Sequence, residues 1–452
     1  MASIPKRIEA IKDDLPQILN PQLITTLCEQ EGHQWRERDL GPVATLRLFM
    51  MQILHGNTAI SHLRHLADMA ISASAYCQAR QRLPLAVMQR LLSHVTDLCR
   101  DAATEVSDDL CWLGHRVFHL DGSSFSMPDT PALQKHFGQP GGQKPGCGFP
   151  VAHLLLMIDA ATGMAIKTLT SPLRTHDMAH AAKMHDELQA GDLLVADRGF
   201  CSYAHLALVL QAKMHGLFRI HQRTIVNFRK GRKQAGQCPK GKKKGKPTSR
   251  WLKKLGLHDQ LVAWRKPKTR PRWMDRQTFV GLADELVLRE LQYLIKRKGF
   301  RTTKVTLVTT LLDAQVYSAA ALAKQYGLRW EIEGHLRELK QTMGMDALRC
   351  ESVDGVMKEL LMFVLVYNLV RLVMGRAASN QKVDIRQISF IDALRWLRVA
   401  GDGRRLPLLI VNPVRADRVE PRAKKRRPKQ YPWLQEPRGK RRQVMADKGV
   451  AA

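Results

Sequence analysis

The sequence predicts an α/β protein in which a helical N-terminal domain precedes a mixed sheet flanked by helices. Two successive patterns along the chain predict this class. Apolar residues recur at helical spacing until about residue 108, and from His115 they form short apolar strands separated by turns and helices. With 452 residues, of which 44% are hydrophobic, the chain is long enough for two to four domains with buried cores.

Residues 1–108 are expected to form the helical N-terminal domain. Four segments place apolar residues three and four positions apart, on one face of a helix; they are 15–28, 43–54, 60–69 and 85–100. The segment 72–84 carries Arg80 and Arg82. These arginines either contact DNA or belong to the surface of an ordinary small bundle, and the sequence leaves both interpretations open.

Residues 109–221 have the element order of an RNase H-like core: three strands, a helix, a strand, a helix and a strand. The strands are 116–121, 151–158, 165–170, 192–197 and 216–221. The first strand ends in Asp121, followed by a Gly-Ser-Ser turn, and the fourth ends in Asp197. The second and third strands are expected to form a hairpin.

A strongly basic interruption, 222–317, follows the first part of the core. From Arg229 to Arg272 it holds 17 Lys or Arg and one acid. Strand-like patterns return later, so we expect a β-rich insertion domain; these strands are 278–282, 286–295 and 304–311. The stretch 236–249 has the composition of a loop, which either clamps DNA or only solubilises the chain.

The chain after the insertion returns to helical patterns. Residues 318–376 are expected to complete the core and to include an apolar helix at 357–374. The remainder, 377–452, is expected to hold an amphipathic helix at 392–399 and a basic tail at 415–442. That tail has 12 Lys or Arg, three acids and four prolines.

The stretch 326–340 carries an unusual set of polar residues. Tyr326, Glu333 and Lys340 are seven residues apart, and Arg329 lies three after the first, so one helix would present all four along one stripe. A carboxylate flanked by two cations suits a metal-bound phosphate, and the stripe is not expected to face the core. The alternative is a solvated helix face with an Arg329–Glu333 ion pair.

Two aspartates and one glutamate are the candidates for phosphodiester chemistry. Two divalent ions about 3.5–4 Å apart stabilise the attacking and leaving oxygens of such a reaction, and Mg²⁺ prefers carboxylate ligands. Strands ending in Asp121 and Asp197 are neighbours in an RNase H-like sheet, and Glu333 would come from a helix packed across them. Their separations of 76 and 136 residues make the site dependent on the fold.

The pattern Y-x-x-R-x-x-x-E-x₆-K, with Leu120-Asp121-Gly122-Ser123 and Ala196-Asp197-Arg198-Gly199-Phe200, resembles the bacterial DDE transposases of insertion-sequence family four. The resemblance covers about residues 70–375 and implies a cut-and-paste transposase. It implies an element end that is nicked, closed into a hairpin, reopened and joined to target DNA. Asp121, Asp197 and Glu333 would be catalytic and hold two Mg²⁺ or Mn²⁺ ions.

The same resemblance implies that the helical N-terminal domain, 1–108, is a DNA-binding domain that contacts the element end. It also implies roles for further residues. Tyr326, Arg329 and Lys340 would hold the terminal phosphates and a flipped nucleotide. A tryptophan of the insertion would stack on the flipped base; the candidates are Trp251, Trp264 and Trp273. The implied partners are double-stranded DNA, as terminal inverted repeats and target, and a second copy of the chain in a homodimer on DNA.

Charge and composition point to the same partner. The formal net charge is +31 and the pI about 10.2, which predicts attraction to a polyanion, nucleic acid before anionic membrane. The longest apolar run, 360–367, is eight residues, too short to span a membrane, and the N-terminus lacks the pattern of a secretory signal. The eight cysteines form no C-x-x-C pair, which favours reduced thiols in a cytoplasmic protein. The resemblance implies that this protein is bacterial and nucleoid-associated.

Two other functions remain as alternatives. A transposase-derived DNA-binding protein would have lost its chemistry, whereas all three acids and all four signature positions are present here. An RNase H-like nuclease or resolvase would share the acids, but it has no need for the 326–340 stripe or a large basic insertion.

Overall fold

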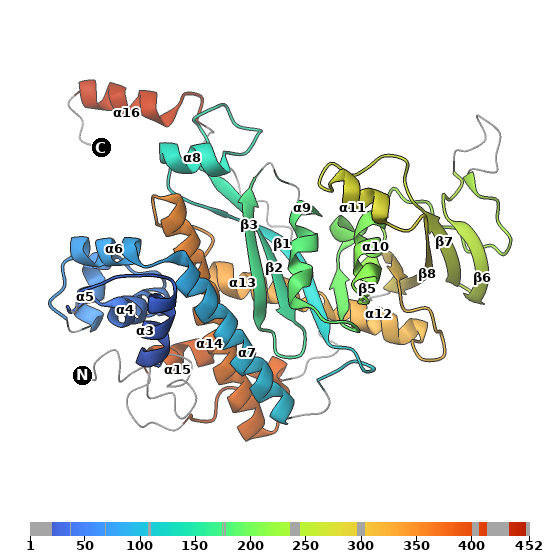
Figure 1. Ribbon diagram of the computed structural model, residues 1–452, viewed down its shortest axis with the longest axis horizontal. Coiled ribbons are helices and arrows are strands. Elements are labelled where there is room, and N and C mark those ends of the chain that lie inside the picture. Colours follow the sequence, from blue (N-terminus) through green and yellow to red (C-terminus); the bar gives the residue numbers. More distant parts are fainter. Residues whose placement is uncertain are drawn as a thin grey trace.

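A nine-stranded mixed sheet runs through the protein (Figure 1). The computed structural model describes residues 20–36, 38–67, 69–106, 110–173, 175, 178–235, 245–295, 303–399, 406–413 and 434–448. The strand order is β3-β2-β1-β4-β5-β9-β8-β7-β6. The strands are β1 (Val117–Ser126), β2 (Val151–Asp159), β3 (Ala165–Pro172), β4 (Leu193–Ala196), β5 (His215–Arg219), β6 (Arg250–Gly256), β7 (Asp259–Arg265), β8 (Glu285–Ile295) and β9 (Thr303–Thr309).

The first five strands have the RNase H-like arrangement that the sequence predicts. β1 pairs antiparallel with β2 and parallel with β4, β2 forms the expected hairpin with β3, and β5 runs parallel to β4. The predicted end of the first strand was wrong, because β1 does not end at Asp121. Gly122 to Ser126 pair with β2 from Leu155 to Val151, and this ladder satisfies their backbone groups, so the Gly-Ser-Ser segment continues the strand instead of turning.

The strands of the predicted insertion extend the core sheet. β5 pairs antiparallel with β9, and β9, β8, β7 and β6 follow as an antiparallel meander. β8 and β9 confirm the strands expected at 286–295 and 304–311. The residues 236–244 of the expected basic loop lie outside the described ranges, and the boundaries of the five domains stay predictions.

The prediction of a strand at 278–282 was wrong. Its residues lie largely in the helix α11 (Arg276–Gly281). The side chain of Asp275 accepts a hydrogen bond from the Thr278 N–H at 2.8 Å and so caps the start of this helix. A capped turn in an exposed connection explains why the β-branched residues there do not pair in the sheet.

The N-terminal helices pack with a long apolar helix, α14 (Val353–Gln381), which runs beside α7 (Leu85–Val106) in Figure 1. They confirm the helical patterns expected in this region, of which residues 15–19 lie outside the described ranges. They are α3 (Pro21–Gln30), α4 (Pro42–Leu54), α5 (Ile60–Ala67), α6 (Ala73–Arg82) and α7 (Leu85–Val106).

α14 is long and apolar enough to cross a membrane by length and composition alone. However, 89% of its most apolar window is buried inside the protein, as in the core helix of a folded domain. It also buries Lys358, Glu359, Asn368 and Arg371 in polar contacts with the surrounding chain. This helix is therefore explained by packing.

The remaining helices pack partly on the sheet and partly on α14. They are α8 (Pro131–Phe137), α9 (Met178–Ala181), η1 (Ala182–Glu187), η2 (Arg198–Phe200), α10 (Tyr203–Gln211), α12 (Ala319–Leu328), α13 (Glu331–Arg337), η4 (Glu338–Thr342), η5 (Ile385–Gln387), α15 (Phe390–Val399) and α16 (Arg438–Asp447). α15 confirms the helix expected at 392–399. Residues 414–433 of the predicted basic tail lie outside the described ranges.

Candidate active site

Two of the three candidate acids are adjacent because of the parallel pairing of β1 and β4. Leu120 of β1 is paired with Ala196 of β4, and the next residue on each strand is Asp121 and Asp197. Asp121 remains within β1, and Asp197 directly follows β4. The sheet therefore brings together two carboxylates that are 76 residues apart in the sequence.

The signature stretch is not one regular helix. α12 ends at Leu328, α13 begins at Glu331, and η4 is a π-helical turn. Between α12 and α13 the backbone hydrogen bonds span three residues, as from the Arg329 N–H to the Tyr326 carbonyl oxygen at 3.1 Å. The single helix expected over 326–340 is therefore replaced by three short elements and the tighter turn between the first two.

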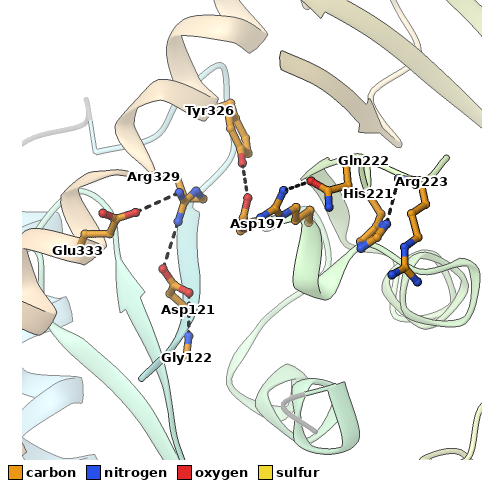
Figure 2. Close-up of polar contacts among 10 residues, drawn as sticks. Asp121, Gly122, Asp197, His221, Gln222, Arg223, Tyr326, Arg329 and Glu333 are labelled. Carbon is orange, nitrogen blue, oxygen red and sulfur yellow. Dashed lines mark hydrogen bonds and ion pairs between the residues drawn. The ribbon is translucent and has the colours of Figure 1, made fainter. Parts of the chain in front are cut away.

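Arg329 lies between two of the acids (Figure 2). Its Nη1 is 3.1 Å from Oδ2 of Asp121, and its Nη2 is 3.4 Å from Oε1 of Glu333. The arginine side chain is 5% exposed, whereas that of Glu333 is 46% exposed. Glu333 thus faces solvent at the outside of the cluster of acids. The Arg329 guanidinium occupies the space between the carboxylates of Asp121 and Glu333.

Tyr326 is also buried, and its hydroxyl donates to Oδ1 of Asp197 at 3.2 Å. Burial raises the pKa of this phenol above its ordinary value, so the hydroxyl remains a donor at neutral pH. The expectation that the stripe avoids the core was therefore wrong for Tyr326 and Arg329. The Arg329–Glu333 pair exists, but it is part of a network with Asp121 and not of a solvated helix face.

Lys340 contacts the same strand as Asp121. Its Nζ donates to Oγ of Ser123 at 3.2 Å and to the carbonyl oxygen of Ser124 at 2.6 Å. These bonds attach the π-helical turn to β1 two and three residues beyond the acid. All six residues that the sequence singled out for the chemistry thus gather around β1 and the end of β4, two neighbouring strands inside the sheet.

The pKa of Asp121 depends on its burial and on the charged groups that lie near it. Burial raises the pKa of its carboxyl above the ordinary value; the Gly122 N–H and the Arg329 guanidinium lower it, and the charges of Asp197 and Glu333 raise it again. Mutual repulsion of close carboxylates is relieved when a cation binds them. The site is therefore electrostatically suited to gain positive charge.

The donor set fits a divalent metal ion, because three carboxylates are the oxygen ligands that Mg²⁺ prefers. Among the described residues, no group of three His, Cys, Asp or Glu is close enough to hold one. Arg329 stands between Asp121 and Glu333, so these two would have to exchange the guanidinium for the ion (Figure 2). The metal-binding role of the three acids stays a prediction.

The three candidate tryptophans are each partly buried. The indole N–H of Trp264 donates to the buried Glu290 at 2.9 Å, Trp273 packs against the core, and Nε1 of Trp251 is buried. Sequence reasoning missed Trp330, which is 50% exposed in the turn between α12 and α13. Its ring lies 5.3 Å from the Arg329 guanidinium. Its place beside Arg329 in the signature stretch was the available signal.

Arg80 does not suit the DNA contact considered for it. It is buried, its guanidinium lies 3.7 Å from the centre of the Phe49 ring, and it donates to Gln52 and to Cys350. Arg82, two residues on, is exposed. The alternation follows from helix α6, which packs one face on the bundle and leaves the other in solvent.

The fold and the clustered acids define the class: an RNase H-like protein equipped for phosphodiester chemistry. The family described as "Transposase DDE domain" matches residues 112–369, more than half of the chain, so the chain belongs to this family. It is a DDE transposase, an enzyme that cleaves DNA, and such enzymes generally use divalent metal ions.

A curated relative and a solved structure were also found. The transposase InsG of insertion sequence element IS4, from Escherichia coli K12, is 28% identical over 388 residues, covering 80% of this chain and 78% of that protein. This supports an IS4-type DDE transposase, as the sequence predicts. The piggyBac transposase synaptic complex with hairpin DNA aligns at a TM-score of 0.42 and 10% identity, covering 88% of this chain and 80% of the other.

Proposed function

We propose that this transposase excises and integrates an insertion sequence through nicking, hairpin formation, hairpin opening and strand transfer. The observation that carries the proposal is the network in which Arg329 joins Asp121 and Glu333 beside the Tyr326–Asp197 hydrogen bond. In the first step water attacks the phosphodiester at the element end and releases a 3′-hydroxyl. That hydroxyl then attacks the opposite strand, forming one phosphodiester bond as another breaks.

Asp121, Asp197 and Glu333 are proposed to hold two ions, Mg²⁺ or Mn²⁺. When bound, these ions would supply positive charge for the attacking and leaving oxygens and a lowered pKa for the attacking water or hydroxyl. Arg329 would turn from the carboxylates to phosphate oxygens, for which its planar fork is well shaped. Tyr326 would orient Asp197, and Lys340 would keep its charge beside β1.

Hairpin formation requires a strongly bent DNA strand, and a base that leaves the DNA stack is stabilised by stacking on an aromatic side chain. Trp330 supports this role better than the three insertion tryptophans, because it is half exposed and lies beside Arg329. We therefore propose that a flipped base at the element end stacks on Trp330. Trp251, Trp264 and Trp273 stay weaker candidates.

The partners are proposed to be the terminal inverted repeats, the target DNA and a second copy of the chain. Two ends must be held together for joint insertion, so a homodimer on DNA is expected, with each active site acting on the end gripped mainly by the other subunit. The net charge of +31 supports a DNA-bound, nucleoid-associated protein of the bacterial cytoplasm.

The test uses the DNA that flanks the gene and ends in its own inverted repeats. Wild-type protein with Mg²⁺ is expected to give a nick and then a hairpin on a denaturing gel. Glu333→Gln should bind but not cleave. The matched control is Glu331→Gln, because Glu331 lies two residues away and pairs with Arg386 at 3.5 Å; it should cleave normally.

The possible outcomes separate the alternatives. Binding without cleavage by the wild type would show a DNA-binding protein that has lost its chemistry. Cleavage of branched DNA without preference for the ends would show a nuclease. Nicks without hairpins would remove the hairpin step from the proposal.

A further inference from the structure

Each of the three candidate acids lies within 4.0 Å of an arginine. Arg329 contacts Asp121 at 3.1 Å and Glu333 at 3.4 Å (Figure 2). Arg198, the residue after Asp197, places its Nε 4.0 Å from Oδ2 of that acid. Two guanidinium groups therefore offset three ionised carboxylates, and the five side chains together keep only one negative charge. A cluster with so little net charge attracts a divalent cation weakly.

The two arginines differ in their exposure to solvent. The Arg198 side chain is 42% exposed, and its Nη1 donates to Oε1 of Gln222 at 2.8 Å. The Arg329 side chain is 5% exposed and contacts two acids at once. Because water and salt screen an exposed ion pair more than a buried one, Arg329 is the stronger obstacle to a further cation between the acids.

Both carboxylate oxygens of Asp121 already have partners. Oδ1 accepts a hydrogen bond from the Gly122 N–H at 2.8 Å, and Oδ2 faces Nη1 of Arg329. A metal ion held by Asp121 and Glu333 would stand against the guanidinium that lies between them, and like charges at such short range repel strongly. The guanidinium and the metal ion therefore compete for these two acids.

A phosphate group can remove this obstacle. The Nε of Arg329 is buried and has no hydrogen-bond partner among the described residues, so the present contacts do not use every donor of the guanidinium. Phosphate oxygens match the planar fork of an arginine. A phosphate that drew the guanidinium away would restore one negative charge to the acids and would bring negative charge of its own. Both changes strengthen the attraction of the acids for a divalent ion.

We infer that Arg329 makes metal binding conditional on DNA. The acids bind a divalent ion weakly in the DNA-free protein and tightly once a phosphate of the element end has taken the guanidinium. The inference rests on the proposed function, because it uses the same acids and the same phosphate. Coupling between two binding sites is reciprocal, so the metal ion must raise the affinity for DNA by the factor by which DNA raises the affinity for the metal ion.

The first measurement is Mn²⁺ binding by full-length, DNA-free protein, followed through the electron paramagnetic resonance signal of the free ion. Arg329→Gln removes the charge and should bind Mn²⁺ about 5- to 150-fold more tightly than the wild type, the usual size of coupling between two sites. Adding Asp121→Asn should abolish this gain, which would place the extra binding at the acids. Arg329→Lys keeps the charge and should stay closer to the wild type. Thermal unfolding shows whether each variant is folded.

Arg386→Gln is the matched control. Arg386 pairs with Glu331 at 3.5 Å, two residues from Glu333, and its side chain is 49% exposed. The substitution therefore removes the same charge near the same helix without freeing a candidate acid. It should leave the Mn²⁺ affinity unchanged.

The second measurement is the affinity for DNA with and without Mn²⁺. The DNA is a 5′-phosphorylated inverted-repeat duplex that lacks flanking DNA and a 3′-hydroxyl, so it can be neither nicked at the end nor joined. The ratio of the two affinities is the coupling factor. This factor should be smaller in Arg329→Gln than in the wild type, by the same ratio as the gain in Mn²⁺ affinity of the DNA-free variant.

Two results would overturn the inference. One is Mn²⁺ binding by folded, DNA-free Arg329→Gln that is no tighter than that of the wild type. The other is an equal coupling factor in the two proteins. Failure of the proposed function is a different result, in which wild-type protein with Mg²⁺ does not cleave its own ends while the Mn²⁺ comparison on DNA-free protein can still be made.

Discussion

Tyr326→Phe tests whether the tyrosine acts through Asp197. The substitution removes one hydroxyl and keeps the ring, and the hydroxyl donates at 3.2 Å to a carboxylate oxygen. A hydrogen bond to a charged group contributes about 1.5–3 kcal/mol, and about 1.4 kcal/mol corresponds to tenfold in rate. If the bond persists during cleavage, nicking should slow by about 10- to 100-fold.

Tyr76→Phe provides the matched control. Tyr76 is also buried, and its hydroxyl donates at the same distance of 3.2 Å, but to the neutral Gln52 in the N-terminal bundle. This variant should lose about 1 kcal/mol of unfolding free energy and keep the nicking rate. Tyr326→Phe should differ in slowing nicking, and by the same reasoning it should lose about 1.5–3 kcal/mol of unfolding free energy.

Single-turnover nicking of the element end, measured beside thermal unfolding of each variant, gives both quantities. If folded Tyr326→Phe nicks within about twofold of the wild type, Tyr326 does not orient Asp197 in the reaction. If both phenylalanine variants slow nicking equally, the effect comes from general loss of packing and the argument from the charged acceptor fails.

Two further predictions concern a base-stacking surface and acid stability. Trp330→Ala should reduce hairpin formation by about 5- to 150-fold with nicking largely retained, because stacking on an aromatic ring contributes about 1–3 kcal/mol per base; equal loss of both steps would contradict this. Burial lowers the pKa of His205 to about 4, and burial with the charge of His205 lowers that of His185 to about 3. The unfolded chain then binds protons that the folded chain excludes, so stability present above about pH 6.5 is lost as the pH falls toward 4, by up to about 1.4 kcal/mol per pH unit for each histidine. In denaturant unfolding, the unfolding free energy of His205→Gln should fall less steeply than that of the wild type between pH 6.5 and 4. If the two proteins lose unfolding free energy equally with pH, the His185–His205 pair is not buried in its neutral form.

Local patterns predicted most elements of this protein because they are encoded within a few residues. The apolar run at 193–196 and the hairpin at 151–172 form strands, and α4 and α15 form helices, where the hydrophobic period indicates. Asp121, Asp197 and Glu333 were singled out because the first two follow apolar runs and the third belongs to a spaced signature motif; their catalytic role stays a prediction. Residue type and spacing are properties of the sequence itself.

Burial and proximity were decided by the tertiary structure. Pairing with β2 extended β1 past Asp121, and a tight turn between α12 and α13 buried Arg329 and exposed Trp330. Arg80 and Arg82 look alike in the sequence, yet one bonds to Cys350, 270 residues away, and the other faces solvent. The reason is physical: a side chain's surroundings come from elements distant in sequence, and these are absent from any local window.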